Sequence, residues 1–316
     1  MSKRNLAGMA AGLAAALTLA GAAYAQSAQE PYIALISKGF QHQFWQAVKT
    51  GAEKAGEKYH VRVTFEGPET EAMVDKQIDM LSAALARKPS AIGFAALDSQ
   101  AAIPLLKKAQ AQHIPVIAFD SGVDSDIPLT TAATNNKAAA AEAADQMAKL
   151  IGDAGEVAVV AHDQTSRTGM DRRDGFLERM KSVHPKVKIV TVQYGGGDQL
   201  KSTDLTKSIL TAYPNLKGVF GTNEGSAIGV INGCREMKRK VVIVGFDSGK
   251  KQTDAIREGF EAGAITQNPV GIGYDTVEAA VKALKGEKLP KVIDTGFYWY
   301  DKTNIDDPKI KAVLYD

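Results

Sequence analysis

The chain has 316 residues, 45% of them hydrophobic, a composition typical of a globular protein with one large or two medium domains. Its 38 Lys and Arg nearly balance its 36 Asp and Glu, so bulk charge directs it neither to nucleic acid nor to an anionic membrane. A single cysteine excludes an intramolecular disulfide, and we predict that Cys234 is a buried structural thiol.

The first 25 residues have the three-part pattern of a secretory signal peptide. Lys3 and Arg4 precede an apolar run at 6–21, and Ala23-Tyr24-Ala25 supplies the small residues of a cleavage site. We predict cleavage after Ala25 and export to the periplasm. The alternative is an N-terminal membrane anchor, for which the run is short and rich in Ala and Gly.

From residue 32 onward, short apolar runs alternate with amphipathic segments. The runs, which we predict to be strands, are 32–37, 61–65, 91–97, 116–120, 157–161, 187–192, 218–222, 241–247 and 263–267. The segments between them, which we predict to be helices, include 44–59, 72–86, 101–112, 137–151, 171–183, 202–213 and 271–285. The runs do not alternate polar with apolar residues, which favours strands covered on both faces. Steady alternation of strand and helix predicts parallel sheets built from βαβ units.

A further apolar run at 129–136 follows Asp120 after only a short turn, with no room for a helix between them. We therefore predict that the chain crosses there into a second sheet. The predicted fold is α/β, with two doubly wound parallel-sheet lobes that each have their own core.

Polar and aromatic residues follow the predicted strands, where ligands gather in doubly wound sheets. These strand ends are 37–45, 120–122, 162–163, 221–224, 245–247 and 267–269. Carboxylates and amides can bond adjacent hydroxyls, and aromatic faces can cover the apolar face of a sugar. The alternatives are that Asp120 and Asp247 cap the helices that follow them, and that Phe44 and Trp45 are core residues.

The usual catalytic and metal-binding motifs are not found. The five histidines are scattered without metal-ligand spacing, and neither G-x-S-x-G nor a phosphate-binding P-loop occurs. Gly195-Gly196-Gly197 is predicted to be a loop. We expect no cofactor, no metal and no catalysis; the rival hypothesis is a sugar-acting enzyme that uses Asp120 and Asp247 as an acid/base pair.

The polar strand ends also carry a family resemblance. With Arg172 in the segment 172–176 and Gln267 before Asn268-Pro269, the sequence resembles the ribose-binding-like periplasmic sugar-binding proteins of ABC transporters, which have the type I periplasmic binding fold. The resemblance covers residues 32–313. The resemblance implies a set of ligand-binding residues, to which Lys38 and His42 of the first loop belong. The set is Lys38, His42, Phe44, Trp45, Asp120, Arg172, Asn223, Asp247 and Gln267.

The sequence departs from ribose binders at several cleft positions. His42 replaces a first-loop asparagine, Ser121 replaces a second arginine, and Gly197 replaces a further aromatic residue. Lys38 resembles a ligand lysine of autoinducer-2 receptors in a neighbouring branch. A pentose, hexose, deoxy sugar or polyol is therefore the expected ligand, and an autoinducer-2-like or sensory receptor is the alternative.

The resemblance implies a discontinuous domain layout. One lobe would comprise 31–133 and 268–295, the other 135–266 and 297–316, with hinge crossings near Thr134, Gln267 and Gly296. The expected partners are the membrane subunits of an ABC importer, or a chemoreceptor or sensor kinase, and the protein is expected to be a monomer. LacI-type transcription factors share the lobes but need an N-terminal DNA-binding motif, where this chain has the leader pattern.

Overall fold

The structure is a computed structural model, and it describes residues 30–315. The predicted signal peptide and its cleavage site after Ala25 lie outside the described residues. Within 30–315, no helix is both long and apolar enough to span a membrane.

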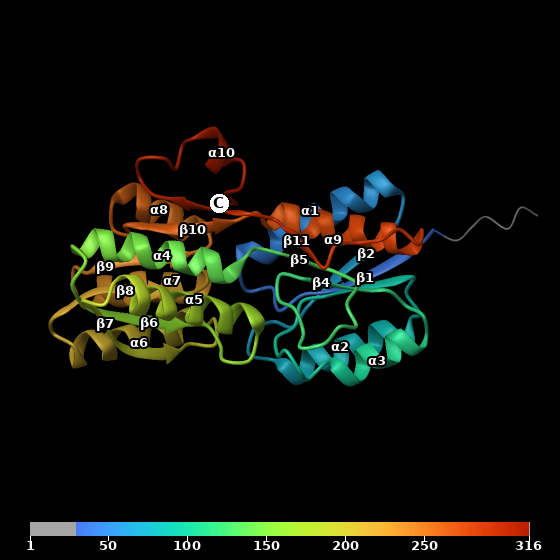
Figure 1. Ribbon diagram of the computed structural model, residues 1–316, viewed down its shortest axis with the longest axis horizontal. Helices are drawn as coiled ribbons and strands as arrows, with labels where there is room; N and C mark the ends of the chain where they lie inside the picture. The colour runs from blue at the N-terminus through green and yellow to red at the C-terminus, as the bar shows by residue number, and fades with distance from the viewer. Residues whose placement is uncertain (1–29, 316) are drawn as a thin grey trace, which may run out of the picture. The chain divides into compact units, whose positions relative to one another are not determined.

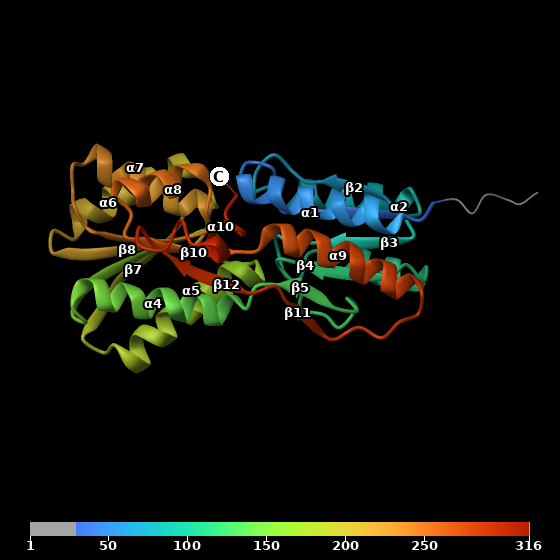
Figure 2. The same ribbon diagram turned by 90° about the horizontal axis from the view of Figure 1, so that it is seen from above.

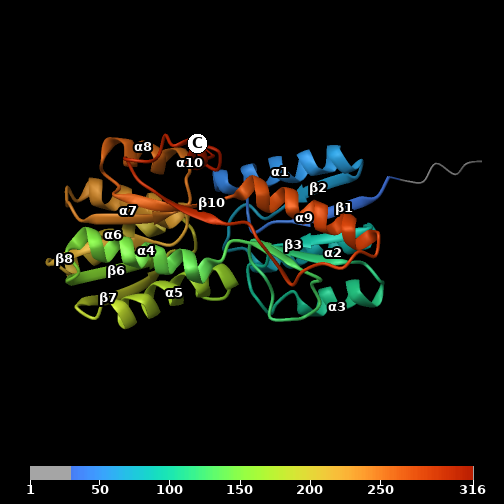
Figure 3. The same cartoon turned by 45° about the horizontal axis from the view of Figure 1, so that its top comes forward.

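The first lobe is a sheet of six parallel strands with helices on both faces (Figure 1). Its strands are β1 (Tyr32–Ile36), β2 (Arg62–Glu66), β3 (Ala91–Phe94), β4 (Val116–Phe119), β5 (Thr131–Ala133) and β11 (Val292–Asp294), in the order β11-β5-β4-β3-β1-β2. Its helices are α1 (Gln43–Tyr59), α2 (Val74–Ala86), α3 (Ile103–Ala111) and α9 (Pro269–Leu284). Helices α1 and α9 cover one face of this sheet, and α2 and α3 cover the other (Figure 3). Ile33 and Leu35 of β1 pack in a core with α1 and α9, whereas Ala34 and Ile36 pack in a core with α2 and α3. Burial on both faces explains the unbroken apolar runs.

The second lobe repeats this arrangement. Its strands are β6 (Gly155–Ala161), β7 (Val187–Tyr194), β8 (Leu216–Gly221), β9 (Val242–Phe246), β10 (Gly263–Gln267) and β12 (Phe297–Tyr300), in the order β12-β10-β9-β8-β6-β7. Its helices are α4 (Asn136–Ile151), α5 (Arg167–Val183), α6 (Gln199–Ala212), α7 (Glu224–Glu236), α8 (Lys250–Glu258) and the short α10 (Pro308–Lys311). The strands are parallel except β12, which pairs antiparallel with β10.

The chain passes between the lobes three times, after β5, after β10 and after β11 (Figure 2). Strand β5 belongs to the first sheet, and the next helix, α4, packs on the second. Likewise β10 belongs to the second sheet, and α9 packs on the first. The two sheets have equivalent strand orders, so β4 in the first lobe corresponds to β9 in the second.

Two helix starts were predicted three or four residues too late. Helix α5 begins at Arg167 rather than 171, and α6 begins at Gln199 rather than 202. The physical reason is capping: Ser166 and Asp198 accept hydrogen bonds from backbone N–H groups of the first turns. The short elements α8, β11, β12 and α10 were not predicted.

Cys234 lies in α7 and is fully buried in the core of the second lobe. Burial raises the pKa of its thiol to about 12, so the reactive thiolate is disfavoured. The prediction of a buried structural thiol is confirmed.

Candidate ligand-binding site

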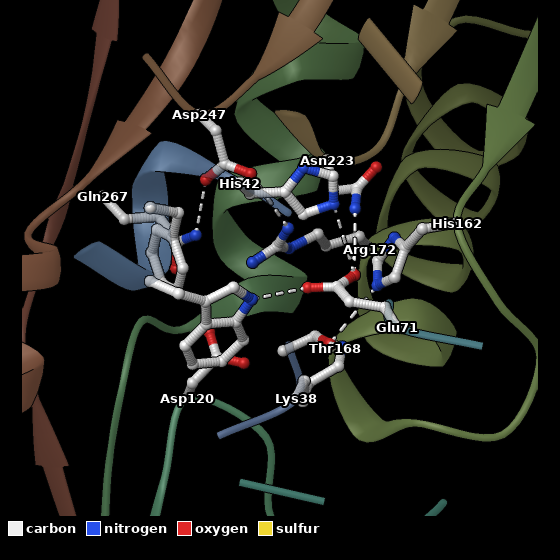
Figure 4. A pocket seen from close by; sticks show the side chains of 12 residues that line it. Lys38, His42, Glu71, Asp120, His162, Thr168, Arg172, Asn223, Asp247 and Gln267 are labelled. Atoms are coloured by element: carbon white, nitrogen blue, oxygen red, sulfur yellow. Dashed lines mark hydrogen bonds and ion pairs between the residues drawn. The ribbon is translucent and has the colours of Figure 1, made fainter. Parts of the chain in front are cut away.

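A buried cavity lies between the lobes where the carboxyl ends of their strands meet (Figure 4). The space between its lining side chains is about 260 Å³, including space that is open to solvent. Its lining residues are Lys38, His42, Phe44, Trp45, Glu71, Asp120, His162, Thr168, Arg172, Asn223, Asp247 and Gln267. The structure thus brings together all nine residues chosen from the sequence. Glu71, His162 and Thr168 were not among them.

The two aspartates of the cavity occupy equivalent places in the two lobes. Each follows a phenylalanine that ends its strand, β4 or β9, and each stands in the same four-residue string, Phe-Asp-Ser-Gly, at 119–122 and 246–249. Asp120 has φ 56° and Asp247 has φ 82°, a left-handed conformation that is uncommon for residues other than glycine. Such strain persists where the surroundings enforce it, and it is concentrated at functional sites.

The carboxylate of Asp247 is held in place by its own lobe. Its Oδ1 accepts a hydrogen bond from Gln267 Nε2 at 2.7 Å, and its Oδ2 accepts one from the backbone N–H of Glu224 at 2.9 Å. Asp247 therefore binds the start of α7 rather than capping the next helix, α8, whose N-cap is Gly249.

Asp120 differs from Asp247 in having no such partners. Within residues 30–315, no hydrogen bond or ion pair holds its carboxylate, although the residue is only 5% exposed. Burial raises the pKa of Asp120 to about 6, against the opposing charges of Lys38 and Arg172. Its acceptor positions are available to a bound molecule.

Arg172 is fixed as a planar donor in the middle of the cavity (Figure 4). Its Nε donates to Asn136 Oδ1 at 2.7 Å, and its Nη1 donates to the carbonyl of Thr222 at 2.9 Å. The guanidinium carbon lies 3.8 Å from the centre of the Phe246 ring. These contacts pre-orient the guanidinium for hydrogen bonding.

Phe44 and Trp45 serve the cavity and the core together. Their rings meet edge to face with centroids 5.0 Å apart, and both side chains belong to the core formed with α9. Trp45 Nε1 donates to Glu71 Oε1 at 2.8 Å, which satisfies the only polar atom of the indole. The two sequence-based interpretations, cavity wall and core residue, therefore both apply.

Two residues of the first loop face the second lobe. Lys38 Nζ donates to Thr168 Oγ1 at 3.0 Å and to Ser166 Oγ at 3.4 Å. His42 Nε2 lies 3.0 Å from Gln41 Nε2, which itself donates to the carbonyl of Gly197 at 3.1 Å. His42 Nδ1 is buried and has no hydrogen-bond partner among the described residues.

Asn223 lies at the start of α7 and has two roles. Its Oδ1 accepts from the backbone N–H of Ser226 at 2.9 Å and so caps the helix, while its Nδ2 donates to Glu71 Oε2 at 3.2 Å. Gln267 Oε1 is buried and has no hydrogen-bond partner in the described part of the chain.

His162 and Thr168 form the cavity wall beside Lys38 (Figure 4). His162 Nδ1 is 2.8 Å from Thr222 Oγ1, and its Nε2 is 3.3 Å from Thr168 Oγ1. Burial lowers the pKa of His162 to about 3, so its imidazole is neutral. The end of a predicted strand already pointed to His162, whereas Thr168 is fixed by the early start of α5.

The lobes also bind each other beside the cavity, through the starts of two helices. Neither His42 nor Gly249, the N-cap residues of α1 and α8, supplies a side-chain acceptor. Instead, Glu224 of the second lobe accepts from the backbone N–H groups of Gln43 and Phe44 at 3.0 and 3.1 Å. In return, Gln43 Oε1 accepts from the backbone N–H of Lys250 at 2.7 Å. Each helix is capped from the opposite lobe.

The cavity is rich in hydrogen-bonding groups but is not arranged for a metal. Among residues 30–315, no three His, Cys, Asp or Glu side chains are grouped so that they could hold a metal ion. The carboxylates of Asp120 and Asp247, the guanidinium of Arg172 and two aromatic rings can bond and cover a small polyhydroxylated ring.

Glu71 was missed because the sequence argument did not examine the end of β2. It lies on the loop between β2 and α2, which follows Glu66-Gly67-Pro68. The strand-end rule, applied to β2 as it was to the other strands, would have included this loop.

Comparisons with known proteins agree with this geometry. A family model described as periplasmic binding protein domain matches residues 33–288. The chain is 26% identical over 290 residues to the ribose import binding protein of Escherichia coli K12, and the alignment covers 92% of this chain and 95% of that protein.

Two solved structures are similar over nearly the whole chain. One is a carbohydrate transporter solute-binding protein from Agrobacterium radiobacter in complex with D-arabinose; it is 34% identical with a TM-score of 0.88, and covers 91% of this chain and 100% of its own. The other is an ABC transporter solute-binding protein from Agrobacterium vitis with bound D-fucose; it is 33% identical with a TM-score of 0.87, and covers 90% of this chain and 100% of its own. The predicted fold of two α/β lobes is confirmed. The chain belongs to the periplasmic binding protein domain family.

Proposed function

We propose that this protein is the solute-binding component of an ABC importer and that it captures a small neutral sugar or polyol between its two lobes. The observation that carries the proposal is the convergence of Asp120, Arg172 and Asp247, drawn from both lobes, on one buried cavity. Carboxylates accept bonds from adjacent hydroxyls, and the planar guanidinium donates to ring or hydroxyl oxygens. The proposed ligand-binding residues are Lys38, His42, Phe44, Trp45, Asp120, Arg172, Asn223, Asp247 and Gln267.

The ligands of solved relatives favour a single sugar ring. Structural relatives were solved with D-arabinose, a pentose, and D-fucose, a deoxyhexose. We propose ligands of these two classes first, with hexoses and polyols next.

The proposed mechanism is closure of the lobes around the ligand. We propose that residues 31–133 with 268–295 form one rigid lobe and 135–266 with 297–316 the other. The three crossings near Thr134, Gln267 and Gly296 would be the hinge. A ligand that bonds both lobes binds the closed arrangement more tightly than an open one, and so shifts the population toward it.

The proposed setting is the periplasm, reached through the leader at 1–25. There the loaded protein would meet the membrane subunits of its importer, and as a monomer it would present both lobes to them. Presentation to a chemoreceptor or sensor kinase is compatible with the same closure. We propose no enzymatic activity, as the family consists of binding proteins.

A thermal-shift screen against neutral sugars, polyols, sugar acids and sugar phosphates tests the proposal. A neutral ligand at a hundred times its Kd should stabilise the protein by about 2.7 kcal/mol. Calorimetry then gives the Kd, and analysis of the ligand after incubation checks for a product. Stabilisation by acids or phosphates alone, or any product, would contradict the proposal.

A further inference from the structure

The loop between β2 and α2 places a third carboxylate in the cavity. Glu71 is 8% exposed, and its two oxygens accept hydrogen bonds from groups of both lobes. Oε1 accepts from Trp45 Nε1 at 2.8 Å in the first lobe, and Oε2 accepts from Asn223 Nδ2 at 3.2 Å in the second. A carboxylate has about four acceptor positions, so two such bonds leave further ones for a bound molecule.

The second lobe approaches this carboxylate with the backbone of a glycine, which has no side chain. A Cβ atom added to Gly197 would lie 2.9 Å from Glu71 Oε2 and 3.1 Å from Asn223 Nδ2. Gly197 also has φ 69°, which disfavours any side chain there. The cavity wall at this place is therefore formed by an acceptor from the opposite lobe and not by a side chain of the Gly197 loop.

The neighbouring cation is partly engaged by the second lobe. Of the three N–H groups of the Lys38 ammonium, two make hydrogen bonds, to Thr168 Oγ1 at 3.0 Å and to Ser166 Oγ at 3.4 Å. Asp163 Oδ2 lies 3.8 Å away as an ion-pair partner. Burial acts to raise the pKa of Glu71, but the ammonium of Lys38 and the Trp45 N–H act against it, and that pKa lies below its usual value. This end of the cavity therefore presents the Glu71 carboxylate as a charged acceptor.

We propose that Glu71 is a specificity-determining residue that accepts a hydrogen bond from one particular ligand hydroxyl. This inference rests on the proposed function. It assigns the Glu71 end of the cavity to a hydroxyl donor, so a ligand with a deoxy carbon or a carboxylate at that position is rejected. A site built to bond a hydroxyl discriminates strongly against analogues that lack it, because its buried acceptor then has no partner.

The test combines protein variants with ligand analogues in a double-mutant-type cycle, and calorimetry measures the Kd of each combination. The tightest neutral sugar and its monodeoxy analogues are titrated into wild type, Glu71→Ala and Glu71→Gln. In wild type, one deoxygenation should weaken binding at least tenfold, and in Glu71→Ala the same change should cost less than twofold. Because charged hydrogen bonds are about twice as strong as neutral ones, Glu71→Gln should show a smaller penalty, about threefold.

Glu69→Gln is the matched control, since Glu69 lies on the same loop and is exposed. It should bind every analogue as wild type does. If Glu71 only supports Trp45 and Asn223, both Glu71 variants will weaken all analogues by one common factor, which overturns the specificity role and leaves the proposed function intact. If wild type binds no neutral sugar or polyol, the proposed function fails, and the role of Glu71 fails with it. Should Glu71→Ala not fold, Glu71→Gln alone decides by the same criterion.

Discussion

The reciprocal helix caps between the lobes predict that Glu224 controls closure without lining the cavity. Glu224 is 3% exposed at the first position of α7, and it accepts both backbone N–H groups at the start of α1. In an open arrangement these groups would face water. The perturbation is Glu224→Ala, which removes the cap of α1 and leaves every cavity-lining residue in place.

The size of the effect follows from the two bonds that are lost. Loss of an N-cap costs ~0.5–2 kcal/mol, and hydrogen bonds to a charged group contribute ~1.5–3 kcal/mol. Burial raises the pKa of Glu224, which means that desolvation of the carboxylate offsets part of this gain. We therefore expect closure to weaken by about 1–2 kcal/mol and the Kd for the ligand to rise about five- to thirtyfold. Gln43→Ala removes a single neutral acceptor from Lys250, so it should raise the Kd only about two- to fivefold.

Calorimetry with the ligand found in the thermal-shift screen measures this effect. Fluorescent labels on the two lobes would report the closed fraction directly. Glu236→Ala is the control, because Glu236 lies on the same helix and is exposed. If Glu224→Ala binds within twofold of Glu236→Ala and closes to the same extent, the capping argument is refuted.

Three further predictions concern single side chains. Arg172→Ala should weaken ligand binding about ten- to a hundredfold, because it removes charged hydrogen bonds. Lys181 is exposed on the same helix, so Lys181→Ala should change the affinity less than twofold, and calorimetry that finds equal affinities for the two variants would contradict the prediction. Burial raises the pKa of Asp120 to about 6, so its carboxylate gains a proton below that pH. The ligand should therefore bind about tenfold more weakly at pH 5 than at pH 7, and Asp120→Asn should abolish this dependence. Burial also raises the pKa of Glu261 well above its usual value, so the stability that Glu261 contributes is present at low pH and is lost as the pH rises through the raised pKa. Urea unfolding should show that Glu261→Gln is more stable than wild type at pH 8, and that this gain is smaller at pH 5.

The fold and most of the cavity could be predicted because they depend on local patterns. Unbroken apolar runs identify strands covered on both faces, and parallel strands bring their carboxyl ends to one edge of each sheet. That rule alone selects the segments that hold Asp120, Asn223 and Asp247. The shared string Phe-Asp-Ser-Gly after β4 and β9 was present in the sequence as well, although it is too short to stand out without the equivalent strand orders.

Contacts between the lobes could not be predicted, because they join residues far apart in sequence through the closed arrangement. Glu224 resembles any acidic residue in the first turn of a helix, where it suits the helix dipole. Its bonds to α1 depend on how the lobes meet. The same is true of Glu71, whose partners Trp45 and Asn223 lie on different lobes.

The two aspartates of the repeated string show how equivalent positions acquire different chemistry. The strand register places Thr134 where the second lobe has Gln267, but Thr134 Oγ1 donates to the carbonyl of Gly296 instead of reaching Asp120. Asp247 is thus bonded by its lobe, whereas Asp120 is buried without a partner among the described residues. Asparagine tolerates the left-handed backbone at both positions, so the exchange of carboxylate for amide tests the side chain alone.

Opposite effects on stability should follow when no sugar is added. At pH 7, Asp120→Asn removes a desolvated charge and should stabilise the protein by about 1–3 kcal/mol, in keeping with a pKa raised to about 6. Asp247→Asn weakens two hydrogen bonds made to a carboxylate and should destabilise it by about 1–3 kcal/mol. Both variants should bind the ligand more weakly. Urea unfolding measures the free energy of unfolding of each variant. Changes of the same sign in the two variants would contradict the argument that Asp120 and Asp247 have different environments.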